Sequence, residues 1–295
     1  MNLKYIVLFI AAVLLMNCSK NDSGSGGGNN GGGGNTGGGG NTGNTDTNCV
    51  ISTISQVNSG IGSESSLSVF YNSSFNVTKL VNYDSVSNTK NFEADLNYIT
   101  ADSVVIDQYQ YLILDPENRV IKFKTKSDLS DPANSDDYLF QYSYNSQGYL
   151  STRNLHINSS QTADLSTTYT YTNNLLTSCI QTAVSSGNLK VLQSTLTYNT
   201  SLKIKNWIYT FPDATSEYMY MTALNFGNRC SNPVQEIVTK IYDPESGNLL
   251  DTWTTNYSNY LLNENGDVLS GEAEGDLQQG IASFYGTTNF YYNCH

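Results

Sequence analysis

The chain has 295 residues, a formal net charge of −12 and a pI of about 4.4. No basic stripe alternates with aromatic residues, so nucleic-acid binding lacks an electrostatic basis and we expect no such partner. Tyrosine alone supplies 22 residues. This excludes intrinsic disorder for the main body and is typical of half-buried antiparallel strands.

Residues 1–17 are predicted to be a lipoprotein signal peptide. Lys4 precedes an apolar run of 12 residues, Tyr5 to Met16, which is shorter than the roughly 20 residues that cross a bilayer. The stretch Leu14-Leu15-Met16-Asn17-Cys18 resembles the lipobox of bacterial lipoproteins, of the Bacteroidetes type in particular. The resemblance implies that Cys18 is the lipid attachment site and that the protein is held at the bacterial outer membrane. It leaves open whether the protein faces the periplasm or the cell surface.

Residues 18–48 are expected to be the lipidated cysteine followed by a flexible linker. Thirteen of the 24 glycines lie between Gly24 and Gly43, interleaved with Asn and Thr. Such a segment buries no apolar area, and about 30 residues of it span on the order of 30 Å as a coil. Phosphate binding by a Gly-rich loop needs a strand before it and a helix after it, and neither is predicted here.

From Cys49 onward the pattern predicts a single all-β domain, 49–295, with little or no helix. Tyr144, Tyr171 and Tyr198 each end an alternating aromatic run, precede a polar turn, and are spaced 27 residues apart. A fixed period with period-2 aromatics indicates repeated β-hairpins. We expect an antiparallel hairpin meander that forms a curved sheet or two packed layers. Further strands are predicted at 202–204, 207–211 and 218–221.

Several of these turns share the order Tyr, Asn or Asp, a short turn, and an aliphatic residue. Three match well and two match weakly: Tyr144-Asn145…Gly148…Leu150, Tyr198-Asn199…Leu202, Tyr242-Asp243…Gly247…Leu249, Tyr71-Asn72, and Asn265-Gly266-Asp267-Val268. This pattern resembles the unit of the YD-repeat (RHS-like) family over most of 50–275. The resemblance implies stacked hairpins in a short meander, because the tight repeat of the long RHS shells is absent.

Four cysteines remain when Cys18 carries lipid, namely Cys49, Cys179, Cys230 and Cys294. An even number in an oxidising compartment predicts disulfides, and four cysteines allow three pairings. We favour Cys179 with Cys230, which leaves Cys49 and Cys294 to join the two ends. A zinc site is disfavoured because no Cys-x-x-Cys pair is present.

Catalysis has little support in the sequence. His156 and His295 are the only histidines, His156 is expected to face solvent between two inward aliphatic residues, and no Gly-x-Ser-x-Gly motif is present. A carboxylate-pair glycoside hydrolase remains an alternative. Its candidate pairs are Asp136 with Asp137, Glu272 with Glu274, and Asp267 with Asp276. We predict no catalytic residue, no metal site and no cofactor.

The C-terminal part of the domain is acidic, since no Lys or Arg follows Lys240. We interpret residues 243–276 as a solvated acidic edge that discourages edge-to-edge aggregation. A Ca²⁺ site in the loop Asn263–Asp267 is the alternative, because its oxygen-bearing residues alternate. A hairpin turn is the favoured interpretation of that loop.

One row of aromatic residues was a candidate binding face: Tyr138, Phe140, Tyr142 and Tyr144. Such a row can stack on sugars or pack against a partner, but alternation favours one wall of the core instead. The sequence therefore predicts a cell-envelope lipoprotein that acts as a non-catalytic binding or structural module, for a glycan or an envelope protein. The alternative besides hydrolysis is a hydrophobic-ligand carrier with a lined pocket of several hundred cubic ångströms. A membrane-embedded sheet would need an apolar outer band, which the Thr/Ser/Asn-rich alternate positions disfavour.

Overall fold

The structure is a computed structural model that describes residues 49–58, 63–205, 207–213, 217–276 and 286–294. The predicted signal peptide, Cys18, the linker and His295 lie outside these residues.

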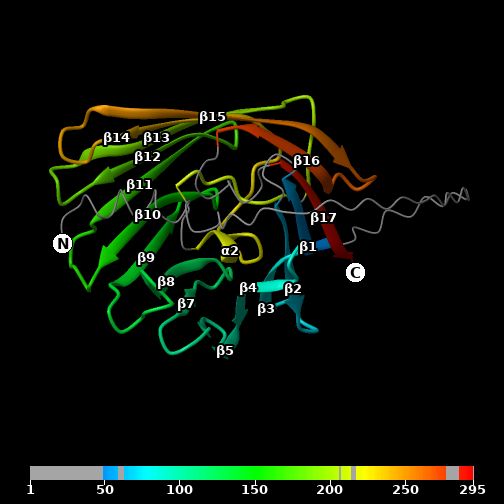
Figure 1. Cartoon of the computed structure of the whole chain (residues 1–295), viewed down its shortest axis with the longest axis horizontal. Helices are drawn as coiled ribbons and strands as arrows, with labels where there is room; N and C mark the ends of the chain where they lie inside the picture. The colour runs from blue at the N-terminus through cyan, green and yellow to red at the C-terminus, as the bar shows by residue number, and fades with distance from the viewer. Residues whose placement is uncertain (1–48, 59–62, 206, 214–216, 277–285, 295) are drawn as a thin grey trace, which may run out of the picture. The chain divides into compact units, whose positions relative to one another are not determined.

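The described chain is almost entirely β-strand, which confirms the all-β prediction (Figure 1). The first nine strands are β1 (Cys49–Asn58), β2 (Ser63–Tyr71), β3 (Val77–Asp84), β4 (Thr89–Asp95), β5 (Asn97–Thr100), β6 (Ser103–Val105), β7 (Tyr111–Leu114), β8 (Val120–Lys126) and β9 (Asp137–Tyr144). The other eight are β10 (Leu150–Ile157), β11 (Leu165–Thr172), β12 (Leu175–Ala183), β13 (Leu189–Tyr198), β14 (Val234–Tyr242), β15 (Leu249–Leu262), β16 (Val268–Gly275) and β17 (Gly286–Cys294). The helix α2 (Tyr218–Met221) has four residues. No helix among the described residues is long and apolar enough to cross a membrane.

The strands form one antiparallel meander that closes on itself. Each strand pairs with the next one along the chain, except that only Leu96 separates β4 from β5. One residue is too few to reverse the chain, so β4 and β5 belong to one pass across the sheet. Seventeen strands less one therefore make sixteen passes. Pairing of β1 with β17 closes the sheet, so the expected curved sheet is found rather than two layers.

The even number of passes has a consequence for the two edges of the meander. Successive passes alternate in direction, so the start of β1 and the end of β17 lie at the same end of the sheet. Cys49 begins β1 and Cys294 ends β17, and these two cysteines form a disulfide. The prediction that they join the two ends is confirmed.

Two of the three repeated tyrosines, Tyr144 and Tyr198, share a structural role at that same end with three further tyrosines, whereas the hydroxyl of Tyr171 has no hydrogen-bond partner among the described residues. Tyr144, Tyr171 and Tyr198 end or nearly end β9, β11 and β13, which are alternate passes, so the period of 27 residues is one hairpin plus its connections. In five places a tyrosine hydroxyl near the end of one strand donates to a backbone carbonyl near the start of the preceding strand. These bonds are Tyr71 to Ile51 at 2.7 Å, Tyr144 to Val120 at 2.5 Å, Tyr198 to Leu176 at 2.9 Å, Tyr260 to Val234 at 2.6 Å, and Tyr292 to Val268 at 2.7 Å.

The residue after each turn tyrosine explains the tight reversals. Asn145 Oδ1 accepts from the backbone N–H of Gln147 and of Tyr149, both at 3.0 Å. Asp243 Oδ1 accepts from Glu245 N at 2.8 Å in the corresponding way. A short polar side chain that bonds to the backbone two residues on stabilises a turn. In the first of these turns Gly148 has φ of +81°, a conformation that favours glycine.

The third hairpin prediction is correct for its turn, where Leu202 N donates to Asn199 O at 3.3 Å and Ser201 N donates to Asn199 Oδ1 at 3.1 Å. It is wrong for its second strand, because a long insertion follows the turn. The 35 residues 199–233 separate β13 from β14, and we call them the inserted segment. The strands predicted at 202–204, 207–211 and 218–221 are instead coil and α2. Alternating aromatics suggested strands there, but their side chains are buried for a different reason. They fill the interior of the closed sheet.

The width of the ring accounts for this insertion. Sixteen passes spaced about 4.8 Å apart and tilted by about 40° enclose a ring of roughly 16 Å radius. Side chains of the strands alone leave a channel in a ring of that size. The inserted segment supplies eight buried apolar side chains to the interior: Ile204, Trp207, Ile208, Phe211, Tyr220, Met221, Leu224 and Phe226.

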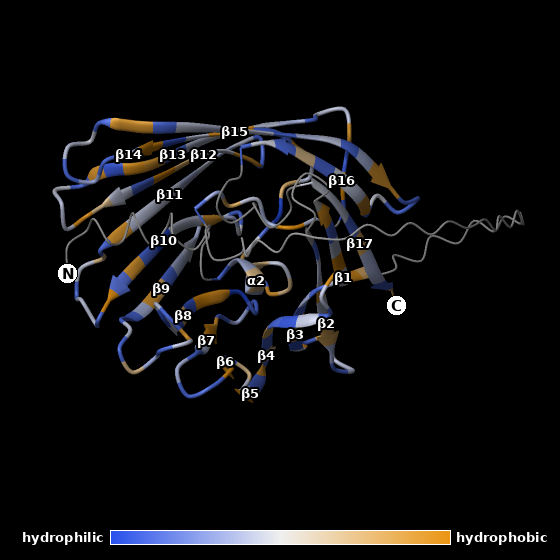
Figure 2. Cartoon of the chain, viewed as in Figure 1, coloured by the Kyte–Doolittle hydropathy of each residue, from blue (hydrophilic) through white to orange (hydrophobic). Residues whose placement is uncertain are grey.

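The inserted segment contacts strands around the ring rather than one wall. Its rings lie 5.0 to 5.1 Å, between centroids, from aromatic rings of four strands. The pairs are Phe226 with Tyr142 of β9, Tyr220 with Phe123 of β8, Phe211 with Tyr169 of β11, and Trp207 with Phe290 of β17. Figure 2 shows the matching alternation of hydrophobic and hydrophilic residues along the surrounding strands. The core is therefore the interface between the sheet and its own insertion.

Candidate functional site

The most unusual feature of the interior is a buried charge cluster of Arg153, Asp213 and Glu217. Arg153 lies on β10, while the two acids belong to the inserted segment. Arg153 Nη1 donates to Asp213 Oδ2 at 3.1 Å, and Arg153 Nε donates to Glu217 Oε1. All three side chains are at most 3% exposed.

Groups from three neighbouring strands complete this cluster. Tyr169 OH of β11 donates to both oxygens of Asp213, at 2.9 and 2.8 Å. Tyr142 OH of β9 lies 3.5 Å from Glu217 Oε1, and the thiol of Cys179 on β12 lies 3.7 Å from Asp213 Oδ1. The Arg153 guanidinium also sits 4.6 Å from the centroid of the Phe140 ring. The desolvation cost of burying these ions is therefore offset by their pairing with one another and by hydrogen bonds from the phenol groups.

The pKa shifts in the cluster follow from this arrangement. Burial alone would lower the pKa of Arg153, but the Glu217 and Asp213 carboxylates raise it well above its ordinary value. Burial, and then the adjacent Asp213, raises the pKa of Tyr169. Burial, and then Glu217, raises the pKa of Tyr142. As pH rises, the arginine therefore stays cationic and the two phenols stay protonated as donors.

This geometry suits an anchor rather than an active site. A catalytic acid or base must reach a substrate, whereas these groups are saturated by one another inside the sheet. They join the middle of the inserted segment to strands β9 to β12. Removing one ion would leave the charge of the others unbalanced inside the sheet, and breaking a buried ion pair in this way is strongly destabilising.

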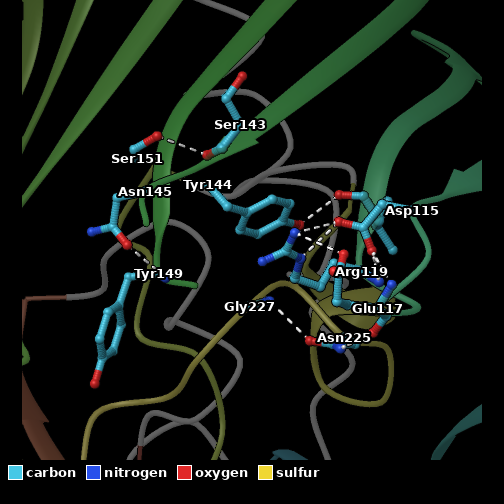
Figure 3. A network of polar contacts seen from close by, with 11 residues as sticks. Asp115, Glu117, Arg119, Ser143, Tyr144, Asn145, Tyr149, Ser151, Asn225 and Gly227 are labelled. Atoms are coloured by element: carbon cyan, nitrogen blue, oxygen red, sulfur yellow. Dashed lines mark hydrogen bonds and ion pairs between the residues drawn. The ribbon is translucent and has the colours of Figure 1, made fainter. Parts of the chain in front are cut away.

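A second attachment holds the far part of the inserted segment at the rim of the sheet (Figure 3). Val120 N donates to Asn225 O at 2.8 Å, and Asn228 N donates to Gly148 O at 2.8 Å. Gly227 has φ of +92°, and a Cβ there would lie 2.5 Å from Gly148 O and 2.9 Å from the Tyr144 ring. Only glycine permits this approach, so residues 225–228 are fitted onto the turn between β9 and β10.

The same rim is stabilised by the ion pair of Arg119 with Asp115 and by the contact of Arg119 with the ring of Tyr144. Arg119 bonds to Asp115 Oδ2 through Nη2 and through Nε, both at 2.7 Å. Its guanidinium lies 4.5 Å from the centroid of Tyr144, whose hydroxyl bonds to Val120 O. Figure 3 shows these side chains converging between the turn after β7 and the turn after β9.

The predicted aromatic row belongs to the core, as the favoured interpretation had it. Phe140 is fully buried and Tyr142 is 4% exposed, while Tyr138 packs edge-on against Phe140 at 6.2 Å. Tyr144 bonds to the backbone at the rim. The row lines the interior and does not present a binding face to solvent.

The favoured pairing of Cys179 with Cys230 is not found. Both are free thiols. Cys179 Sγ points to Asp213, whereas Cys230 Sγ accepts from Leu176 N at 3.4 Å and lies 3.5 Å from Tyr198 OH. The two thiols therefore have separate partners, one in the charge cluster and the other at the end of β13. Burial raises the pKa of each.

The predicted carboxylate pairs are not brought together at a cleft among the described residues. Asp137 pairs with Lys126 at 3.1 Å, while Asp136 accepts from Asn158 Nδ2 at 2.5 Å. Glu272 accepts from Asn259 Nδ2 at 2.5 Å and Glu274 is exposed on the same strand. Asp267 and Asp276 flank β16 at its two ends, roughly 30 Å apart, far beyond the 5–10 Å that glycoside hydrolysis requires.

The loop Asn263–Asp267 adopts the hairpin turn that the sequence favoured over a calcium site. Asn263 Oδ1 accepts from Asn265 N and Asp267 N, both at 2.9 Å, so this oxygen is used by the turn itself. No cluster of three metal-binding side chains occurs in the part of the chain that the structure describes. His156 Nδ1 lies 3.0 Å from Ser160 O at the end of β10.

One small pocket opens between the inserted segment and β15 to β17. It is lined mainly by Trp207, Tyr257, Tyr260 and Gly271, and its volume is about 10 Å³. A site for a drug-sized ligand needs several hundred cubic ångströms. The pocket is therefore far too small for the ligand of a hydrophobic carrier.

Sequence reasoning missed the buried charge cluster. Asp213 and Glu217 stand four residues apart within an aromatic stretch, and Arg153 interrupts an alternating strand of otherwise neutral residues. Isolated charges of opposite sign in apolar surroundings are the signal, since such residues are buried only when paired. Nothing in the sequence shows which charges pair.

Comparison with known proteins shows the fold and no family. No protein-family model and no curated protein sequence matches the chain. Among solved structures, a porin-like protein from Bacteroides uniformis ATCC 8492 has a TM-score of 0.56 at 19% identity, covering 82% of this chain and 98% of that one. A porin-like protein from Bacteroides vulgatus ATCC 8482 has a TM-score of 0.54 at 10% identity, covering 83% and 99%. The chain therefore shares the fold of these porin-like proteins of Bacteroides.

Proposed function

We propose that this protein is a lipid-anchored, non-catalytic module of the bacterial outer membrane, in which the closed sheet serves as a rigid binding or structural unit. Acyl chains on Cys18 would anchor it, and residues 19–48 would tether the sheet. Its partner would be an envelope protein or a glycan. The observation that carries the non-catalytic role is the filled interior, whose charged groups are saturated by one another.

The filled interior also argues against a channel, despite the names of the structural neighbours. A ring of sixteen passes conducts only if its lumen holds water. Here the lumen contains the inserted segment, with Phe226 and Tyr220 packed against the surrounding strands. Anchoring at two points, the charge cluster and the rim, keeps that segment in place.

The outward side chains support a sheet that stands in water. On β11 the residues that alternate with the buried ones are Ser166, Thr168, Thr170 and Thr172, and on β13 they are Gln193, Thr195 and Thr197. Strands that face lipid carry apolar residues at these positions, and a Lys or Arg near the bilayer midplane costs about 2–4 kcal/mol. Lys240, the seventh of the nine residues of β14, is exposed. This polarity fits a tethered domain beside the membrane.

Two measurements test the proposal. Metabolic labelling with a palmitate analogue should mark the wild-type protein in the outer-membrane fraction, and Cys18→Ala should abolish both the label and the fractionation. Reconstitution of the purified protein into planar bilayers should give no stepwise conductance. Label retained by Cys18→Ala would refute the anchor, and stepwise conductance would refute the filled, non-conducting role.

A further inference from the structure

The two ends of the closed sheet differ in what their turns carry. Because passes alternate in direction, the turns that follow β2, β5, β7, β9, β11, β13 and β15 lie at the end where β1 begins and β17 finishes. We call this the tether end, since Cys49 is where residues 19–48 join the sheet. The turns after β3, β6, β8, β10, β12 and β14 lie at the opposite end, at the left of Figure 1 for β12 and β14.

Charge is distributed unequally between these ends. The described turns of the opposite end contain seven carboxylates and no Lys or Arg: Asp107, Asp128, Asp131, Asp136, Asp164, Asp243 and Glu245. The described turns of the tether end, which include the inserted segment, contain four cations, Arg119, Lys203, Lys205 and Arg229, and seven carboxylates, Asp102, Asp115, Glu117, Asp213, Glu217, Glu264 and Asp267. The formal charge of the turns is therefore −3 at the tether end and −7 at the opposite end, so an anionic surface would repel the opposite end more strongly.

Exposed large hydrophobic side chains lie at both ends of the sheet, with Val86, Leu129, Leu249 and Leu250 at the opposite end. At the tether end, four of them lie on or beside β15, β17 and β2, and three of these four are aromatic. Tyr291 of β17 is 55% exposed, Phe70 of β2 is 49% exposed, and Phe75 in the turn after β2 is 46% exposed. Leu261, near the end of β15, is 57% exposed. The strands run in the order β15, β16, β17, β1, β2, so these residues occupy an arc centred close to β1, where the tether joins. We call Leu261, Tyr291, Phe70 and Phe75 the tether-end arc.

The exposed apolar area of the tether-end arc is comparable to that of patches that mark interaction sites. A large aromatic side chain presents roughly 200 Å² when fully exposed, so three half-exposed rings leave on the order of 300 Å² open. Apolar patches of about that size on a soluble domain mark interaction sites. Four inter-strand steps at about 4.8 Å spread the arc over roughly 19 Å.

We propose that the tether-end arc rests on the surface of the bilayer that carries the lipid anchor. The inference depends on the proposed function, because it requires an anchored chain. Phenylalanine and tyrosine side chains favour the region where acyl chains meet headgroups. A linker of about 30 residues holds the sheet within tens of ångströms of the bilayer, so even a weak surface contact is populated through its high effective concentration. The acidic opposite end then faces away from the anionic headgroups.

The test places one reporter at each end of the full-length acylated protein in vesicles of phosphatidylethanolamine and phosphatidylglycerol. Tyr291→Cys reports on the arc and Leu250→Cys on the opposite end; the native side chains are similarly exposed, at 55% and 58%. The cysteines at 179 and 230 are free but lie within the sheet, and those at 49 and 294 are bonded, so a maleimide dye labels the introduced thiol. Nitroxide-bearing lipid should quench the dye at 291 and leave the dye at 250 at its vesicle-free intensity.

A second pair of variants separates the arc from the anchor. In the Tyr291→Cys background, Phe70→Ser with Phe75→Ser should abolish most of the quenching, whereas Val86→Ser with Leu129→Ser at the opposite end should not. All four native side chains are exposed, so the fold is retained. Equal quenching at 250 and 291, or none at either position, overturns the inference. A third result also overturns the inference: in the absence of vesicles, the dye at position 291 becomes shielded from solvent as the protein concentration rises. That result would assign the arc to a second copy of the chain. Flotation distinguishes the two proposals: protein that does not float with vesicles lacks the anchor, while protein that floats without quenching at 291 lacks only this contact.

Discussion

Replacing Arg153 by methionine should release the inserted segment more effectively than any other single change. Arg153 is 3% exposed and pairs with Asp213 and Glu217, both fully buried. Arg153→Met keeps much of the aliphatic volume but removes the cation. Two carboxylates are then left inside the sheet without the cation that balances their charge.

The expected magnitude follows from the cost of an unpaired buried charge. Removing one partner of a buried ion pair destabilises a protein by about 3–5 kcal/mol. For a domain of this size each kcal/mol lowers the melting temperature by about 2–4 °C. We therefore expect the melting temperature of Arg153→Met to fall by about 6–20 °C.

Thermal melts followed by circular dichroism measure the global loss, and limited proteolysis measures the local one. Cleavage within residues 199–233 should become fast in the variant at temperatures where the strands are still intact, because the segment is held mainly by the charge cluster and the rim. Trp207 lies within this segment and is buried, so its fluorescence should shift to the red over the same temperature range.

A triple variant supplies the decisive control. Arg153→Met combined with Asp213→Asn and Glu217→Gln removes all three charges and keeps the shapes of the acids. If the charge imbalance causes the loss, the triple variant should regain most of the lost melting temperature. A triple variant that melts as low as the single one, or a single variant within about 2 °C of the wild type, would refute the reasoning.

Three further outcomes are expected. Tyr144→Phe should lower the free energy of unfolding by about 1 kcal/mol, because the carbonyl of Val120 loses its hydrogen-bond donor. Tyr171→Phe should leave the free energy of unfolding unchanged, because the buried Tyr171 hydroxyl has no partner among the described residues. Urea unfolding compares the two variants, and equal losses would contradict the role of Tyr144 at the rim. Burial raises the pKa values of Cys179 and Cys230, so a thiol reagent should modify neither in the native protein at neutral pH and both after unfolding; rapid native labelling of either one contradicts this. Burial raises the pKa of Tyr71 to about 12, while unfolded phenols ionise near 10; the unfolded state therefore loses protons first, and stability should fall as pH rises above about 10. The phenolate absorbance of the buried tyrosines should then appear in a cooperative step together with unfolding, and a titration of all 22 tyrosines that is complete before the protein unfolds would contradict it.

The sequence predicts the strands and their turns well because both depend on local chemistry. Tyr144 followed by Asn145 and Gly148 specifies a reversal through a side-chain bond and a positive φ, all within five residues. Alternation of buried and exposed residues on β11 reflects the two faces of one strand. Such signals require no knowledge of distant residues. They also place the aromatic row of β9 in the core, as alternation favoured.

The interior and the cysteine pairing depend on residues far apart in the chain, and local patterns do not specify them. Trp207 and Phe211 alternate as in a strand, yet they are buried against β17 and β11 from within the ring. Arg153 meets Glu217 across 64 positions of sequence. Cys179 with Cys230 is only the favoured one of three possible pairings, and the position of Cys230 depends on where the inserted segment returns to the end of β13.

The number of passes links these observations. A closed meander of eight passes fills itself with its own side chains, whereas one of sixteen leaves a lumen. Such a ring can conduct, or it can fill the lumen from its own sequence. This chain fills it, and the polarity of both surfaces agrees: apolar side chains point inward to meet the inserted segment, and threonine and serine point outward. A conducting ring in lipid requires the reverse on both faces. The same count of passes brings Cys49 and Cys294, which form a disulfide, to one end of the closed sheet.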